Sequence, residues 1–240
     1  MKTFLTIAGL DPCGGAGVVA DIKTAKSIGF FPLCVVTTLT VQNTSGVYGI
    51  YPVDPEVIEE QIKKIVEDLE IDAIKIGLLP NLKVSEVIAT FLKELDAVKV
   101  LDPVIYSGTG TKMGSEDAYR MLMRYVDVIT PNLTEAKILS SKNSVFEAGE
   151  ELKKHVKAVV ITGGELGGKD HIFESNFYTV EAEFSNITIH GTGCVYSSAL
   201  ACYLAERGNL EDAVRLARLF VLESVKKSVI LGKGYPCVNP

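Results

Sequence analysis

The sequence predicts a single α/β domain over residues 1–240, in which a mainly parallel sheet is covered by helices on both faces. Three observations support this class. The length of 240 residues suits one large unit that buries about three-quarters of its extended-chain surface. Apolar runs rich in β-branched residues recur along the chain, and helix-like segments lie between most of them. Such alternation is typical of a parallel sheet whose ligand-binding loops follow the carboxyl ends of the strands.

Six apolar runs are predicted as strands buried on both faces. They are residues 3–9, 33–41, 72–79, 98–104, 126–130 and 157–164. Residues 44–53, TSGVYGIYPV, interrupt this rhythm because apolar positions alternate with small or polar ones. We expect them to form a small β flap.

Two helices have clear apolar stripes. Residues 55–69 should form the first, with Asp54 as N-cap and Pro55 at the first helical position. Its stripe consists of Ile58, Ile62, Ile65 and Leu69. The second helix follows Asn209. Its stripe consists of Ala213, Leu216, Ala217, Phe220 and Val221.

Composition excludes several classes of protein. Hydrophobic residues make up 47% and charged residues 22% of the chain, which excludes a disordered protein. The net charge of −6 is spread along the sequence, so we expect no nucleic-acid partner. No apolar run is long enough to span a bilayer, and the N-terminus fits a first strand better than a signal peptide, so we expect no membrane partner. The five cysteines form no CxxC pair, which favours a reducing cytoplasm over a disulfide framework or a zinc site.

Most glycine-rich loops fail the spacing of nucleotide-binding motifs. The loops at 14–17 and 191–193 lack the third glycine of GxGxxG, because those positions are Ala20 and Tyr196. Residues 163–170, GGELGGKD, satisfy GxxxxGK, but Asp170 stands where a magnesium-binding Ser or Thr belongs and the chain continues like a strand. We expect a hairpin there.

The segment GTGC, Gly191 to Cys194, is different because a helix-like run of small residues follows it at once. Its glycines allow backbone N–H groups to turn toward one point, and a helix N-terminus adds positive potential. The sequence therefore predicts an anion site with Cys194 beside it. A tight turn holding a buried cysteine is the alternative.

Six phrases in order extend this pattern through most of the chain. They are LTIAGLDPCGGAGVVADIKT, VVTTLTVQNTSGV, AIKIGLL, LDPV, VITPNLTEA and HGTGC. With them the sequence resembles the hydroxymethylpyrimidine and hydroxymethylpyrimidine-phosphate kinases of thiamine biosynthesis, within the ribokinase-like superfamily. The resemblance implies a three-layer α/β/α sandwich with a mainly parallel sheet and a small β flap. It also implies ATP and Mg²⁺ as cofactors, and a homodimer.

The implied reaction transfers the ATP γ-phosphoryl group to the hydroxymethyl of 4-amino-5-hydroxymethyl-2-methylpyrimidine, and then a second one to that monophosphate. Phosphoryl transfer needs positioning and positive potential more than covalent help. The backbone N–H groups of Gly191, Thr192, Gly193 and Cys194 would supply that potential as an anion hole. Cys194 would act as the base if the helix N-terminus favours its thiolate, an effect that the triphosphate charge opposes.

The resemblance also assigns the pyrimidine site. Gln42 matches the glutamine that pairs with a ring nitrogen and the exocyclic amine, since its amide is both donor and acceptor. The other matching positions around this pocket are Gly9, Ala16, Asp21, Leu78 and Val104. Leu78 stands where some relatives carry methionine. For Asp21 a position on a helix surface is the alternative.

Asn132 and Glu135 match an NxxE element that helps to place Mg²⁺, often through water. A helix cap with an exposed glutamate is the alternative. Asp102, at a strand end, is a second candidate for the metal and phosphate region. Thr162, Gly164 and Asn132 are the expected nucleotide contacts.

One position departs from the family pattern. Many members carry lysine where Thr162 precedes the paired glycines. It therefore stays open which side chain, if any, neutralises the transferring group, and Lys169 and Lys112 are the two candidates. Thr162 also matches a pyridoxal kinase branch. Pyridoxal or pyridoxine kinase is therefore the second hypothesis, and a non-catalytic pyrimidine-binding regulator is the third; Gln42 favours the pyrimidine.

Three further residues receive no catalytic role. Lys75 is interpreted as a strand-end cation, and His190 as a cap of the preceding strand. Cys13 is interpreted as a small filler where relatives usually have serine.

Overall fold

A computed structural model describes residues 1–181 and 188–240. These residues form one sheet with the strand order β3-β2-β1-β4-β5-β6-β7-β8-β9. Its strands are β1 (Thr3–Leu10), β2 (Phe31–Asn43), β3 (Gly46–Pro52), β4 (Ala73–Ile76), β5 (Val98–Leu101), β6 (Val128–Ile129), β7 (Ala158–Ile161), β8 (Lys169–Phe173) and β9 (Phe177–Glu181). The pairs from β2 through β7 are parallel, whereas β3, β8 and β9 pair antiparallel.

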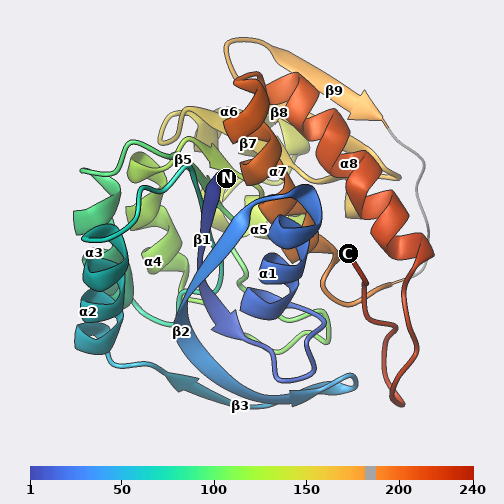
Figure 1. Ribbon diagram of the computed structural model, residues 1–240. Helices are drawn as coiled ribbons and strands as arrows, with labels where there is room; N and C mark the ends of the chain where they lie inside the picture. Colours follow the sequence, from blue (N-terminus) through green and yellow to red (C-terminus); the bar gives the residue numbers. More distant parts are fainter. Residues whose placement is uncertain (182–187) are drawn as a thin grey trace.

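Helices cover both faces of this sheet (Figure 1), which confirms the expected three-layer class. One face carries α1 (Gly17–Ile28), α7 (Thr192–Arg207) and α8 (Leu210–Lys226). The other carries α2 (Pro55–Val66), α3 (Leu82–Leu92), α4 (Glu116–Leu122), α5 (Leu133–Ser140) and α6 (Val145–Lys153). Short 3₁₀ turns lie at η1 (Met123–Tyr125) and η2 (Gly163–Glu165). No helix among the described residues has the length and apolarity needed to cross a bilayer.

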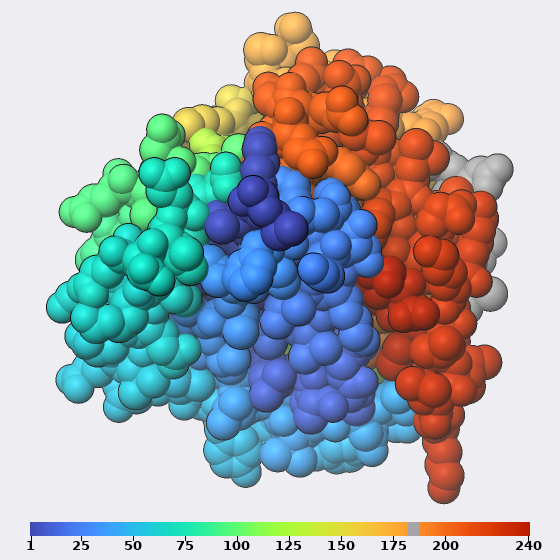
Figure 2. All heavy atoms as spheres, in the orientation of Figure 1, coloured from blue at the N-terminus to red at the C-terminus, as the bar shows by residue number. Residues whose placement is uncertain are grey.

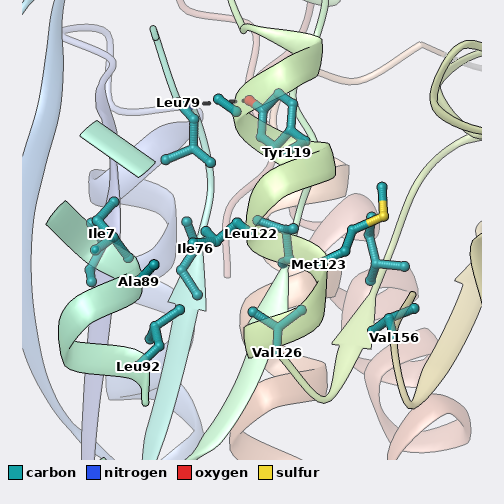
Figure 3. Packing of buried hydrophobic residues seen from close by; sticks show 14 of the residues in the cluster. Ile7, Ile76, Leu79, Ala89, Leu92, Tyr119, Leu122, Met123, Val126 and Val156 are labelled. Carbon is teal, nitrogen blue, oxygen red and sulfur yellow. Dashed lines mark hydrogen bonds between the residues drawn. The ribbon is translucent and has the colours of Figure 1, made fainter. Parts of the chain in front are cut away.

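The central strands form because both of their faces are buried. Phe4 joins the core beneath α1, α7 and α8, while its neighbour Leu5 joins the core beneath α2 to α6. Figure 3 shows the second core, where Ile76 of β4 lies among side chains of α3 and α4. Alternate residues therefore anchor each layer of helices.

Four of the predicted strands extend too far. The runs at 72–79, 98–104, 126–130 and 157–164 contain strands of two to four residues. The remaining apolar residues, such as Leu78 and Leu79, are buried in the loops that follow the strands. Burial alone therefore does not mark where hydrogen bonding to the neighbouring strand stops.

Both predicted hairpins are present. Residues 46–52 pair with the second half of β2, from Thr38 opposite Pro52 to Asn43 opposite Gly46, so the flap is an extension of the sheet edge. Strands β7 and β8 pair antiparallel, from Val159 opposite Phe173 to Ile161 opposite His171, so residues 162–168 are the loop of a hairpin. This confirms the hairpin expected at 163–170 and excludes the P-loop.

The helix predicted at 55–69 begins as expected and ends early. The Asp54 side chain accepts from the Glu56 N–H, and Ile58 and Ile62 are fully buried. The helix ends at Val66, so the assignment of Leu69 to its buried stripe is wrong, and Leu69 is 37% exposed. Helix α8 begins after Asn209, whose side chain accepts from the Asp212 N–H.

The C-terminal segment returns from α8 to the carboxyl ends of the strands. The His190 N–H donates to the Pro236 carbonyl at 2.8 Å, and the Tyr235 N–H donates to the Thr44 carbonyl at 3.0 Å. Figure 2 shows the red C-terminal residues beside blue α1, in agreement with the packing of Val238 on Ala20. This segment therefore ties the β2–β3 turn to the loop before α7.

Candidate active site

The loops after β1 and β2 meet the N-terminus of α7. The Thr40 hydroxyl donates to the Leu10 carbonyl at 2.8 Å, and the Cys13 thiol donates to the Gln42 carbonyl at 3.4 Å. Gly191 packs so closely on the loop after β1 that an added Cβ would lie 1.7 Å from the Gly15 carbonyl oxygen. Three segments that the sequence marked as ligand-binding are therefore side by side.

The start of α7 has the form expected of an anion site. Gly191 adopts φ 92°, a left-handed conformation that favours glycine, and no side chain in the described part of the chain caps the helix. A Cβ at Gly193 would meet no described atom within 4 Å, so the first turn is open. The first N–H groups of a helix lack partners within the helix. Those of Thr192, Gly193 and Cys194 are thus available to an anion.

Cys194 lies in the first turn of α7, and the residue is partly exposed. Burial raises the pKa of its thiol to about 12; Lys75 acts in the opposite direction, while Asp102 and Asp21 raise the pKa further. A pKa near 12 favours the thiol at pH 7 over the thiolate that the helix N-terminus was expected to stabilise.

This pKa predicts a distinctive alkylation profile for Cys194. Because only the thiolate reacts, the rate at this residue should rise about tenfold per pH unit between pH 7 and pH 9, without a plateau. Mass-spectrometric quantification of iodoacetamide adducts on the Cys194 peptide measures this rate. Cys34, an exposed residue, provides the internal comparison, and a plateau below pH 8 at Cys194 would contradict the assignment.

A buried lysine lies beneath this turn. Lys75 of β4 has no exposed surface, and its ammonium lies 2.9 and 3.0 Å from the two oxygens of Asp21 and 3.5 Å from Asp102. Burial alone would lower the pKa of Lys75, but the neighbouring negative charges raise it above its usual value. The interpretation of Lys75 as a strand-end cation is wrong, because its side chain is enclosed between the sheet and α7.

Asp21 belongs to the same buried group. Besides Lys75, its carboxylate accepts from the Thr6 hydroxyl at 2.6 Å and the Ser198 hydroxyl at 2.8 Å. Asp21 has no exposed surface, so the alternative of a helix-surface residue is excluded. Both of its oxygens are bonded inside the protein, and the expected position of Asp21 around the pyrimidine pocket stays a prediction.

Asp102 and Glu135 are the two carboxylates predicted near a metal. Asp102 is 6% exposed and accepts from the Ser197 hydroxyl at 2.9 Å. The side chain of Glu135, 7% exposed, accepts from the Asn132 N–H at 3.0 Å, while the Asn132 side chain accepts from the Glu135 N–H at 2.8 Å. The helix cap of the alternative interpretation is therefore present as a capping box. Its glutamate, however, is buried and not exposed as that alternative required.

The charges of these two carboxylates fit a cation between protein and phosphates. Burial, and secondarily the charge of Asp102, raises the pKa of Glu135 to about 8, and burial raises the pKa of Asp102. No group of three His, Cys, Asp or Glu able to hold a metal occurs among the described residues. A Mg²⁺ ion held by one or two carboxylates, water and substrate phosphates is consistent with both observations.

The predicted nucleotide residues lie together. The Thr162 N–H donates to the Pro131 carbonyl at 2.9 Å, which brings Thr162 next to Asn132. A Cβ at Gly164 would meet no described atom within 4 Å. Asp170 is fully buried; it accepts from the Gly163 N–H at 2.6 Å and lies 3.0 Å from Arg218. Asp170 therefore anchors the loop from inside.

The two candidate phosphate cations are both engaged elsewhere. Lys169 forms an ion pair with Glu181. Lys112 lies 2.9 Å from Glu116. The structure thus favours neither as the partner of the transferring group, and the positive potential nearest to Cys194 comes from the α7 N-terminus and Lys75.

The other predicted pocket residues lie near the ends of β1, β4 and β5. A Cβ at Gly9 would lie 2.8 Å from the Leu78 side chain, so Gly9 and Leu78 are in contact. Ala16 is the N-cap of α1. The Val104 carbonyl accepts from the Tyr119 hydroxyl, which also accepts from the Leu79 N–H (Figure 3).

Sequence reasoning missed one central residue near Gln42, the carboxylate Asp11. The imidazole Nε2 of His190 lies 2.9 Å from the Asp11 carboxylate, so the assignment of His190 as a cap of the preceding strand is wrong. Asp11 is 3% exposed. Its position before Pro12 and two glycines is typical of a turn in which an aspartate accepts from nearby N–H groups.

Comparisons with known proteins agree with this geometry. The profile of the family described as phosphomethylpyrimidine kinase matches residues 11–239. A hydroxymethylpyrimidine/phosphomethylpyrimidine kinase of Aquifex aeolicus is 39% identical over 253 residues, covering 98% of each chain.

Two solved structures are similar over most of the chain. An ADP complex of Bacillus subtilis pyridoxal kinase has a TM-score of 0.88 and 30% identity, covering 100% of this chain and 97% of that one. A Clostridium difficile phosphomethylpyrimidine kinase has a TM-score of 0.81 and 32% identity, covering 94% and 100%. The resemblance and the ribokinase-like fold expected from the sequence are confirmed. The chain therefore belongs to the phosphomethylpyrimidine kinase family, whose members are phosphotransferases.

Proposed function

We propose that this protein uses ATP to phosphorylate 4-amino-5-hydroxymethyl-2-methylpyrimidine and then its monophosphate, giving the diphosphate for thiamine biosynthesis. The observation that carries the proposal is that the loop after β1 contacts both Gln42, through the Cys13 thiol, and Gly191 at the open start of α7. An amide that would read the ring and an anion site that would receive the phosphoryl group are thus joined through one loop.

The chain's own residues would act mainly by positioning. N–H groups of Thr192, Gly193 and Cys194 would stabilise the charge on the transferring group, the largest contribution expected of a protein in such a reaction. The Cys194 sulfur would lie next to the acceptor hydroxyl and, as a thiolate, accept its proton. Because Cys194 is a thiol in the ligand-free protein, its ionisation must precede or accompany that step.

ATP and Mg²⁺ would occupy the neighbouring loops. Asn132, Thr162 and Gly164 would contact the nucleotide, and Asp102 and Glu135 would hold Mg²⁺ through water. The ion would neutralise part of the phosphate charge. The buried, mutually repelling carboxylates and the adjacency of residues 130–135 and 162–165 support this assignment.

Pyridoxal kinase activity is the second candidate. It is favoured by the similarity to Bacillus subtilis pyridoxal kinase and by Thr162. Gln42 favours the pyrimidine, because an amine beside a ring nitrogen matches a two-sided amide better than a phenol does. A non-catalytic regulator is disfavoured because the cysteine, the anion loop and the NxxE element are all in place.

Mass analysis of products distinguishes these functions. With ATP, Mg²⁺ and the unphosphorylated pyrimidine, we expect first the monophosphate and then the diphosphate. Parallel assays with pyridoxal compare the two acceptors under the same conditions. Faster turnover of pyridoxal would overturn the substrate assignment, and ATP consumption independent of either acceptor would overturn the kinase function.

We further propose that the protein is a cytoplasmic homodimer that buries the outer face of the β2–β3 hairpin. Thr40 and Gln42 face the site, so Leu39, Val41 and Tyr51 project from the opposite face, where they are 48, 53 and 61% exposed. Such an apolar face on an edge hairpin is typical of a protein interface.

Light scattering tests the dimer. We expect twice the chain mass of 25.9 kDa for the wild type and the single mass for Val41→Asp, because a charge would be buried without a partner. Leu219→Asp, at an exposed leucine of α8, is the matched control and should remain dimeric. A monomeric wild type would contradict this interface.

A further inference from the structure

A C-terminal arm connects two segments of the candidate site. After α8 the chain turns back on itself, and the backbones of Val229 and Cys237 exchange hydrogen bonds of 3.0 and 2.9 Å. Residues 229–238, which we call the C-terminal arm, therefore form a hairpin. Its hydrogen bonds reach the residue before the anion loop of α7 and the turn that joins β2 to β3.

The base of the arm is fixed beside the anion loop. The His190 N–H donates to the Pro236 carbonyl at 2.8 Å, and the Val238 N–H donates to the His190 carbonyl at 3.0 Å. His190 directly precedes Gly191, and the buried side chain of Val238 belongs to the same apolar cluster as Val195 of α7. A change farther out on the arm should therefore leave the approach to α7 in place.

The outer part of the arm holds the β2–β3 turn. The Tyr235 N–H donates to the Thr44 carbonyl at 3.0 Å, and the Gly234 N–H donates to the Thr44 hydroxyl oxygen at 3.2 Å. An added Cβ at Gly234 would lie 1.9 Å from the Thr44 carbonyl oxygen. Any side chain at this position would thus push the arm and the turn apart.

The turn transmits such a displacement to the end of β2. The Ser45 N–H donates to the Asn43 side chain at 2.9 Å, and Asn43 pairs with Gly46 across the turn. The turn is therefore braced internally, and Thr44 lies only two residues after Gln42. A misplacement of about 1 Å caused far from the chemistry can lower a rate about a hundredfold. The position of the arm should therefore matter for catalysis although the arm touches neither Gln42 nor Cys194 through these bonds.

We propose that Gly234 and Tyr235 are positioning residues, which hold the ring-binding end of β2 at the correct distance from the anion loop. The inference rests on the proposed pyrimidine kinase function, in which Gln42 reads the ring and the loop before Cys194 binds the phosphoryl group. The acceptor hydroxyl is in line with that group only when both segments keep their separation. The C-terminal arm supplies this constraint from outside both binding sites.

Steady-state kinetics of Gly234→Ala test the proposal. We expect kcat/KM for the pyrimidine to fall by about tenfold or more, with a higher KM for the pyrimidine, because the end of β2 is displaced. The KM for ATP should stay within about twofold of the wild-type value, since the base of the arm is unchanged. A purely structural defect would reduce the active fraction and so lower kcat with both KM values unchanged. That result would overturn the proposal.

Lys233→Ala provides the matched control, because Lys233 is the exposed neighbour of Gly234 on the same arm. It should leave both KM values at those of the wild type. A wild type that does not phosphorylate the pyrimidine would overturn the proposed function itself. Wild-type turnover together with an unchanged pyrimidine KM in Gly234→Ala would overturn only the inference.

Amide hydrogen exchange of the wild type covers the case in which Gly234→Ala does not fold. After correction for intrinsic rates, the N–H groups of Gly234 and Tyr235 should exchange more slowly than that of Leu231, which lies on the same arm and is 77% exposed. Such protection requires that the arm stay bonded to Thr44 in solution. Equal exchange rates at these positions would show that the arm does not hold the turn, and would overturn the proposal whatever the enzyme's activity.

Discussion

Lys75→Met is expected to destabilise the protein by about 3–5 kcal/mol. The substitution keeps a long apolar stem in the core but removes the only charge that the structure places between Asp21 and Asp102 among the described residues. Both carboxylates would remain buried without a cation, and unpaired buried charges are costly. Because a folded domain has only about 5–15 kcal/mol of stability, much of it would be lost.

Urea denaturation monitored by far-ultraviolet circular dichroism measures this loss, since the chain contains no tryptophan. The matched control is the double variant Lys75→Met/Asp21→Asn, which removes one positive and one negative charge together. It should recover a substantial part of the stability, because its asparagine can still bond Thr6 and Ser198. A single variant within about 1 kcal/mol of the wild type would show that the pair is not structural.

The strands were predictable because a buried strand leaves a strong local signal. Runs such as residues 3–9 are apolar on both faces, and that pattern requires a sheet covered on both sides. Their carboxyl ends were not predictable, because Leu78 and Leu79 continue the apolar run while the backbone already leaves the sheet. The assignment of Leu69 to the buried stripe of the helix was wrong for a similar reason, since the helical period of apolar residues continues past the end of α2.

The residues of the candidate site also fall into those that could be predicted from the sequence and those that could not. Gln42 and the turn before Cys194 are recognisable from short contiguous phrases. Asp11 and Lys75 are not, because their roles depend on residues far away in the sequence: His190 lies 179 positions after Asp11, and Lys75 lies 54 after Asp21. A single sequence gives the charge of each residue but not the partner that burial provides.

The pKa of Cys194 could not be predicted from the sequence for the same reason. A helix N-terminus lowers a thiol pKa, and this part of the expectation was sound physical chemistry. The opposing effects arise from burial and from Asp102 and Asp21, which reach the thiol only through the folded arrangement of β4, β5 and α1. Local sequence therefore predicted the place of the cysteine but not its protonation state.

Cys194→Ala is expected to lower kcat at least about a hundredfold, the usual contribution of a positioned acid–base group. The KM for the pyrimidine should change little, because the proposed contact with the ring is Gln42 at the end of β2 and not the sulfur. Steady-state assays with varied pyrimidine separate the two constants. Near-normal turnover of this variant would remove Cys194 from the mechanism.

The pH dependence of kcat/KM tests whether the sulfur acts as a base. This constant reports the ionisation of the free enzyme, and the pKa of Cys194 there is about 12. If the thiolate is required, wild-type kcat/KM should rise about tenfold per pH unit from pH 7 to pH 9, with the protonated thiol as the inactive form. Cys194→Ala should lack this slope.

Cys194→Ser keeps a group that can contact the acceptor hydroxyl but ionises far less readily, so its kcat should resemble that of the alanine variant. A serine variant close to the wild type, with a flat wild-type profile, would instead identify the thiol as a hydrogen-bonding group that orients the acceptor.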